Sequence, residues 1–148
     1  MRKVIVVDID GTVADISHRV HHLEQKTPKD WISFRQGHEK DKPIMHIINL
    51  VKTLSKTHDI VFCTGREESE REVTEHWLNK NYPAFCYEAL LMRPNNNRQP
   101  DAIVKPKLLT AYGLNPNIVE FILEDRNSVV KRWRELGYVC LQVADGDF

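Results

Sequence analysis

The sequence lacks the features that mark secreted and membrane proteins. Its 148 residues include only three cysteines, and this odd, scattered set does not indicate the disulfide framework of a small secreted domain. Cys63 and Cys140 lie in apolar, strand-like runs, where buried free thiols are expected. The first apolar stretch, Val4–Val7, is too short for a signal peptide or a membrane span. We therefore expect a cytoplasmic protein without a membrane partner.

The sequence also lacks an excess of either charge. Lys plus Arg and Asp plus Glu number 21 each, so bulk charge favours neither nucleic acid nor a membrane surface as a partner, although a local basic patch stays possible. Internal repeats and low-complexity tracts are absent as well. No Gly-x-x-x-x-Gly-Lys-Ser/Thr loop occurs in these residues, which excludes a P-loop kinase site within them.

Short apolar runs alternate with amphipathic segments along most of the chain. Strands are expected at residues 3–7, 59–64, 89–92, 118–123 and 138–143. Helices are expected at residues 43–56, 68–80, 102–112 and 127–136. This alternation predicts an α/β fold, Rossmann-like, with three α/β/α layers around a mainly parallel central sheet. In such sheets ligands bind outside the carboxyl ends of the strands.

Residues 13–41 break the alternation, because they are long and polar. A segment of this length predicts a small helical cap insertion over the site rather than a bare loop. We expect one domain, residues 1–148, with its core in 1–12 and 42–148.

Aromatic and histidine side chains stand out in this insertion. Trp31 and Phe34 are more often the core of such a cap than platforms for base stacking. His18 and His22 are four residues apart, a spacing that could suit zinc, but no third ligand is identifiable nearby. We therefore expect no zinc site here.

The strongest chemical signal is the run Asp8-Ile9-Asp10-Gly11-Thr12, directly after the first expected strand. Carboxylates two residues apart leave a strand on the same side, and like charges this close are costly unless a cation lies between them. Mg²⁺, a hard cation that prefers oxygen ligands, solves that problem. An exposed acidic turn or a Ca²⁺ loop is the alternative, but a Ca²⁺ loop needs more acidic ligands than the one that follows, Asp15.

Three further polar features fall at expected strand ends or helix starts. Thr64-Gly65-Arg66 ends the second strand, Lys105 lies in the first turn of a helix, and Glu124-Asp125 ends a later strand. Alone, Lys105 would be an ordinary solvated lysine, and Arg66 could form a surface ion pair. Asp101 precedes a helix, where capping is the simplest account of it.

These four features, in this order, resemble the haloacid-dehalogenase-like superfamily. From Val4 to Phe148 the chain further resembles the 3′-phosphatase domain of phage-type polynucleotide kinase. The resemblance is carried by Thr64-Gly65-Arg66-Glu67, Asp101-Ala102-Ile103-Val104-Lys105, Glu124-Asp125-Arg126 and the ending Gln142-Val143-Ala144-Asp145-Gly146-Asp147-Phe148. The chain departs from that family at Glu124, where the family has Asp, and in residues 13–41, which match poorly apart from Arg19.

The resemblance implies a role for each matching residue. Asp8 is expected to attack phosphorus, and Asp10 to act as the acid and then the base. Thr64 is expected to hold a phosphate oxygen, and Lys105 to offset the clustered acids. The expected Mg²⁺ ligands are Asp8, Asp125, Glu124 and Asp10, the last through a nearby backbone carbonyl. The expected substrate contacts are Arg19, Gly65, Arg66 and Asp101. Arg93 and Arg98 flank a loop at a strand end, where they are expected either to contact a nucleic-acid backbone or to be solvated.

The expected function is therefore a Mg²⁺-dependent phosphomonoester hydrolase that forms an aspartyl phosphate and removes 3′-phosphates from DNA or RNA ends. A phosphatase for free nucleotides or another small phosphoester is the alternative. An inactive module that binds nucleic-acid ends is disfavoured, because Asp8, Asp10, Lys105 and Asp125 are all present. A dehalogenase is disfavoured too, since attack on carbon needs neither a leaving-group acid nor a metal. The oligomeric state stays open.

Overall fold

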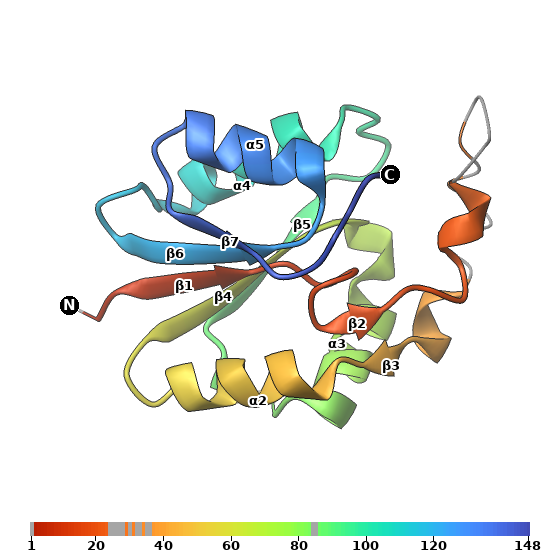
Figure 1. Ribbon diagram of the computed structural model, residues 1–148, viewed down its shortest axis with the longest axis horizontal. Coiled ribbons are helices and arrows are strands. Elements are labelled where there is room, and N and C mark those ends of the chain that lie inside the picture. The colour runs from red at the N-terminus through yellow and green to blue at the C-terminus, as the bar shows by residue number, and fades with distance from the viewer. Residues whose placement is uncertain (1, 24–28, 30, 32–33, 35–36, 84–85) are drawn as a thin grey trace.

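A five-stranded parallel sheet forms the centre of the protein (Figure 1). The computed structural model describes residues 2–23, 29, 31, 34, 37–83 and 86–148. The strand order is β5-β4-β1-β6-β7. The strands are β1 (Val4–Val7), β4 (Asp59–Glu67), β5 (Ala89–Arg93), β6 (Val119–Glu124) and β7 (Cys140–Gln142). The parallel α/β fold predicted from the alternation is confirmed.

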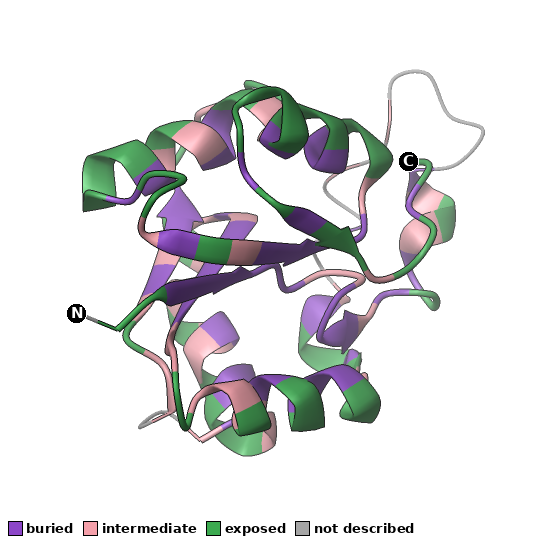
Figure 2. Cartoon of the chain, turned by 60° about the vertical axis from the view of Figure 1, so that its left-hand side comes forward, coloured by how far each residue is buried: buried purple, intermediate pink, exposed green. Residues whose placement is uncertain are grey.

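Helices cover both faces of this sheet. In Figure 1, α2 (Met45–Leu54) and α3 (Arg71–Asn81) lie below it, and α4 (Asp101–Tyr112) and α5 (Asn127–Glu135) lie above it. Successive strand residues point to opposite faces, so β1 contributes Ile5 and Val7 to one core cluster and Val4 and Val6 to the other. Figure 2 shows the buried strands enclosed by helices whose outer surfaces are exposed. None of the described helices is both long and apolar enough to cross a membrane.

Strand β4 is longer than the sequence pattern indicates. It continues beyond Thr64 to Glu67, and its register with β5 shifts between those two residues. Such an irregularity re-aims side chains at the edge of a sheet. The expected strand, residues 59–64, is therefore three residues too short, and Thr64-Gly65-Arg66 lies at the carboxyl end of β4 as expected.

A small antiparallel pair closes the base of the 13–41 segment. Strand β2 (Ala14–Asp15) pairs with β3 (Lys42–Pro43) and brings the two ends of the segment together. Short 3₁₀ turns follow at η1 (Val20–His22) and η2 (His38–Lys40), and a third, η3 (Glu68–Glu70), precedes α3. Part of the expected cap, residues 24–28, 30, 32–33 and 35–36, lies outside the described residues, so its extent stays a prediction.

Candidate active site

Asp8 lies at the carboxyl end of the central strand β1 and is almost completely buried. Its backbone N–H donates to the Leu123 carbonyl of β6, which fixes the chain beyond the strand. The Thr12 hydroxyl donates to Asp8 Oδ2 over 3.1 Å, and Lys105 Nζ donates to Asp8 Oδ1 over 2.8 Å. The carboxylate is therefore held at both oxygens by neighbours that the fold itself supplies.

Lys105 links the carboxylates at the ends of β1 and β6. Besides Asp8, its Nζ donates to Glu124 Oε2 over 2.8 Å, and all three side chains are buried. Burial alone would lower the pKa of Lys105, but the charges of Asp8 and Glu124 outweigh it and raise the pKa well above its usual value. Lys105 is thus a permanent positive charge next to Asp8.

One lysine does not balance the negative charge here. Asp8, Glu124 and Asp125 each offer an oxygen within 4.8 Å of the others. Burial raises the pKa of Glu124 to about 8, and the charge of Asp8 adds to the rise. Burial raises the pKa of Asp125 to about 10, with further contributions from Asp8 and Glu124. A divalent cation with oxygen ligands would relieve this crowding, so the three residues fit Mg²⁺.

Two glycines permit the close packing around these acids. Gly11 has a φ of +80°, and a Cβ there would lie 1.9 Å from Asp125 Oδ2. A Cβ on Gly65 would lie 2.4 Å from Asp101 Oδ1. Each glycine therefore lets a carboxylate reach a position that a side chain would block.

Asp10 faces away from the acidic cluster and lies between two arginines. Its Oδ1 accepts from Arg19 Nη2 over 2.7 Å and from Arg66 Nη2 over 2.6 Å, and its Oδ2 accepts from Arg66 Nε over 3.2 Å. Burial would raise the pKa of Asp10, but the charges of Arg66 and then Arg19 outweigh it and hold the pKa well below its usual range. The Asp10 carboxylate is ionised in this arrangement and is not part of the metal-binding group.

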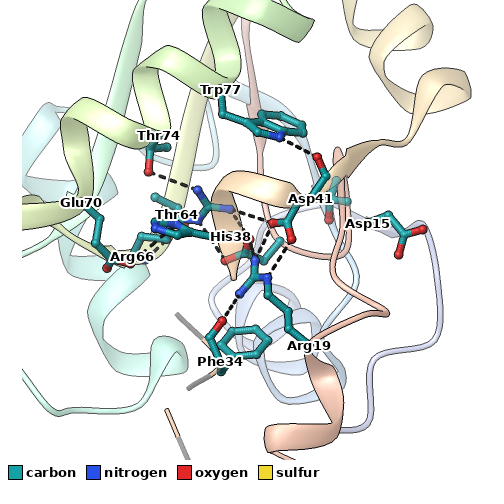
Figure 3. A network of polar contacts seen from close by, with 12 residues as sticks. Asp15, Arg19, Phe34, His38, Asp41, Thr64, Arg66, Glu70, Thr74 and Trp77 are labelled. Atoms are coloured by element: carbon teal, nitrogen blue, oxygen red, sulfur yellow. Dashed lines mark hydrogen bonds and ion pairs between the residues drawn. The ribbon is translucent and has the colours of Figure 1, made fainter. Parts of the chain in front are cut away.

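The Asp41 carboxylate accepts hydrogen bonds from both Arg19 and Arg66 (Figure 3). Arg19 donates to it from Nε over 2.8 Å and from Nη2 over 2.6 Å, while Arg66 Nη2 donates over 3.3 Å. The Asp41 backbone carbonyl accepts from Trp77 Nε1 of α3 over 2.8 Å, so Asp41 is tied to the core. Asp41 carries no motif that sequence reasoning could use; only its place at the end of η2, beside β3, brings it here.

Two histidines with printed contacts, His18 and His38, lie near this network. His18 Nε2 lies 2.7 Å from Asp41 Oδ1, and no group of metal-binding side chains among the described residues includes His18 or His22. His38 is buried near Arg66, and burial followed by that positive charge lowers its pKa to about 4. His38 is consequently neutral at physiological pH.

A second polar network, around Arg93 and Asp101, lies on the side of the site formed by the 94–100 loop. Arg93 donates from Nε to the Gly65 carbonyl over 2.7 Å, from Nη1 to the Asn97 carbonyl over 3.0 Å, and from Nη2 to Asp101. Arg126 Nη1 donates to Asp101 Oδ2 over 3.3 Å. The capping interpretation of Asp101 was wrong, because no side chain of the described residues caps α4 and Asp101 pairs with arginines instead. Arg93 holds the 94–100 loop in place.

These residues enclose a cavity of about 340 Å³. Most of the residues predicted for the site line it: Asp8, Asp10, Arg19, Gly65, Arg66, Arg93, Arg98, Asp101, Lys105, Glu124 and Asp125. Thr64 does not line it, and its hydroxyl accepts the Arg66 amide over 3.2 Å. Arg126, Trp31, Phe34 and Phe148 also line the cavity. Arg126 was missed as a site residue although it directly follows Asp125, which was the available signal.

Comparison with known proteins places the chain in a family. The family description "Polynucleotide kinase PNKP phosphatase domain" matches residues 2–148. A protein of Autographa californica nuclear polyhedrosis virus, named for polynucleotide kinase and RNA ligase, is 29% identical over 136 residues, which are 90% of this chain and 18% of that protein.

Solved structures agree with the family match. A chain of the Pnkp1/Rnl/Hen1 complex superposes with a TM-score of 0.83 at 31% identity, covering 100% of this chain and 48% of that one. A haloacid dehalogenase-like hydrolase from Streptococcus pneumoniae superposes with a TM-score of 0.69 at 14% identity, covering 95% of this chain and 84% of that one, and shows the shared fold. The chain spans less than half the length of the first two relatives.

The contact between Gly11 and Asp125 can be tested against a matched glycine. Gly11→Ala and Gly113→Ala both place alanine at positive φ, which costs about 1–2 kcal/mol of unfolding free energy. Only Gly11→Ala also displaces the Asp125 carboxylate, since nothing lies within 4 Å of a Cβ on Gly113. We expect Mg²⁺ to raise the melting temperatures of the parent protein and of Gly113→Ala equally, and to have little effect on that of Gly11→Ala. An equal Mg²⁺-induced shift in both variants would contradict this account.

Proposed function

This chain belongs to the family of polynucleotide kinase phosphatase domains, and we propose that it is a Mg²⁺-dependent phosphatase that removes 3′-phosphates from polynucleotide ends. The observation that carries the proposal is the position of Asp8. It lies at the centre of the sheet edge, held by Thr12 and Lys105, within the acidic group and on the wall of the cavity.

Asp8 is the nucleophile in this proposal. One of its oxygens attacks phosphorus, and the bond between phosphorus and the sugar oxygen breaks to give an aspartyl phosphate. Water then attacks that phosphorus and returns Asp8 and inorganic phosphate. The buried Lys105 charge stabilises the negative charge that builds up on the phosphoryl oxygens in both steps.

Asp8, Asp125 and Glu124 would hold Mg²⁺, which when bound supplies positive charge that offsets the carboxylates and polarises a phosphoryl oxygen. Glu124 also accepts a hydrogen bond from Lys105, so the same carboxylate would contact both the cation and the lysine. The Lys105 contact and the distances within the acidic group show that the Glu124 carboxylate reaches the cluster.

Asp10 is the proton donor to the leaving oxygen and then the acceptor of the proton from water. As found here it is ionised and paired with Arg19 and Arg66. A phosphoryl group entering the cavity competes for the same guanidinium donors, because phosphate oxygens are strong bidentate partners for arginine. Loss of those contacts frees Asp10 to turn toward the substrate and raises its affinity for a proton.

The polynucleotide assignment draws on the family and on the rim of the cavity. Arg98 is exposed at that rim, where it can meet a backbone phosphate next to the terminal one. A structurally similar chain, 30% identical, belongs to the Pnkp1/Rnl/Hen1 RNA repair complex, which favours nucleic-acid ends over small phosphoesters as the substrate. A phosphatase for free nucleotides is the second candidate, since it would use the same Asp8 and Lys105 chemistry.

A substrate panel separates these two candidates. We expect kcat/KM to be highest for a 3′-phosphorylated oligonucleotide, lower for a 3′-mononucleotide and lowest for a 5′-phosphorylated oligonucleotide, measured by phosphate release. Added salt should reduce the oligonucleotide value more steeply, because neutralised backbone phosphates release counterions. The Asp8→Asn variant is the control and should release no phosphate. Equal kcat/KM for the oligonucleotide and the mononucleotide at every salt concentration would favour the small-phosphoester candidate.

The metal can be tested without turnover as well as with it. Saturating Mg²⁺ should stabilise the protein by about 2.7 kcal/mol at a hundredfold excess over Kd, seen as a higher melting temperature. Asp125→Asn should lose most of this shift and need more Mg²⁺ for half activity, whereas Asp145→Asn, at an exposed position outside the cavity, should behave like the parent protein. Full activity after exhaustive chelation would remove Mg²⁺ from the proposal.

The proton-transfer role of Asp10 predicts a dependence on the leaving group. Asp10→Asn should slow hydrolysis of an alkyl phosphate by about 10²–10⁴-fold, because an alkoxide needs a proton to leave. Hydrolysis of p-nitrophenyl phosphate should fall far less, since nitrophenolate leaves without one. The aryl substrate corrects for any disturbance of Arg19 and Arg66 within the same variant. Equal losses on both substrates would assign Asp10 another role.

A further inference from the structure

The cavity has an aromatic wall that phosphate chemistry does not use. Besides the acids and arginines, Trp31, Phe34 and Phe148 line it. At about 340 Å³ the cavity falls within the roughly 300–1,000 Å³ typical of small-molecule sites, which is more space than a phosphoryl group alone requires. The wall is therefore available to the part of the substrate attached to the phosphate.

Arg126 joins this wall to the reacting groups. Its guanidinium carbon lies 5.4 Å from the centre of the Trp31 ring and 5.2 Å from that of Phe148, both within the range of cation–π contacts. Its Nε donates to the Phe148 carbonyl over 2.7 Å and its Nη1 donates to Asp101. Since Arg126 directly follows Asp125, the aromatic wall begins one residue from the acidic cluster.

The aromatic residues are not equally available. Phe34 is buried with Ile16 and Leu23 in the small core of the 13–41 segment and meets Trp31 edge to face at 5.7 Å. Trp31 and Phe148 are only partly buried, and they pack on that core while facing the cavity. Phe34 thus supports the wall, and Trp31 and Phe148 form its accessible surface.

We propose that Trp31, Arg126 and Phe148 form a binding site for the base of the nucleotide that carries the 3′-phosphate. This inference rests on the proposed 3′-phosphatase function. Bases stack on aromatic rings and on arginine planes, and a base is joined to its own 3′-phosphate through a single sugar. The rings of Trp31 and Phe148 contact the faces of a base, which all four bases offer, so the site accepts any of them.

The test compares two 3′-phosphorylated oligonucleotides that differ only at the last nucleotide, one with a base and one abasic. The parent protein should favour the base-bearing oligonucleotide in kcat/KM by about 5- to 150-fold, the range expected for stacking of one base. The preference should appear mainly in KM, because stacking is present before and during the reaction. Exchange of the last base among all four should change kcat/KM by only a few-fold.

Variants of the aromatic residues test whether they cause the preference for the base-bearing oligonucleotide over the abasic one. Trp31→Ala should reduce the ratio between the two oligonucleotides to about twofold, and Trp31→Phe should keep most of it, because phenylalanine still offers a ring. Phe148→Ala should give an intermediate ratio. The ratio is measured within each variant, so a general loss of activity cancels. Tyr112→Ala removes an exposed aromatic ring at the far end of α4 and should keep the parent ratio.

The outcomes separate the base site from the proposed function. Equal hydrolysis of the two oligonucleotides by the parent protein, or an unchanged ratio in Trp31→Ala, would overturn the base site and leave the 3′-phosphatase function standing. Hydrolysis of p-nitrophenyl phosphate without hydrolysis of either oligonucleotide would overturn the proposed function and the base site with it.

Discussion

The crowding of buried carboxylates at one edge of the sheet constrains the rest of the site. Asp8 and Asp125 follow neighbouring parallel strands, so the fold brings their charges together whether or not a cation is bound. Isolated buried charges are very costly, and among the described residues Lys105 is the buried counter-charge within this group. Gly11 leaves space for Asp125, and the Thr12 hydroxyl holds Asp8 by a hydrogen bond, so both positions keep the carboxylates close enough for the proposed cation.

Two aspartates only two residues apart are given different environments. Asp8 meets a lysine and two further acids, whereas Asp10 meets Arg19 and Arg66 and is kept ionised by them. Paired carboxylates with separate environments are the usual basis for separate catalytic roles. Arginines are also natural partners of phosphate, so in the proposed mechanism substrate binding and proton transfer depend on the same two side chains, Arg19 and Arg66.

The sequence was enough to predict the layers of the fold and the chemical centre of the site. The spacing of apolar residues predicted the five strands of the parallel sheet and the four α-helices that cover it. Local motifs predicted the positions of Asp8, Lys105 and Asp125. Long-range contacts were not predictable in the same way. The β2–β3 pair is only two residues long on each side, too short for a periodic signal. Asp41 reaches Arg19 and Arg66 because that pair closes the segment. The contacts of Asp101 depend on Arg93, the last residue of β5, and on Arg126, which follows β6.

The 13–41 segment connects these observations, because it contributes to both ends of the cavity. Arg19 and Asp41 fix the state of Asp10, and Trp31 lies on the aromatic wall with Phe34 behind it. Arg19 also donates to the Phe34 carbonyl over 2.9 Å and lies 4.2 Å from the centre of its ring, so the control of Asp10 and the support of the wall share one side chain. A change in how Trp31 and Phe34 pack would therefore reach Asp10 through Arg19. In the proposed mechanism, the 13–41 segment therefore couples contact with the substrate base at Trp31 to the state of Asp10.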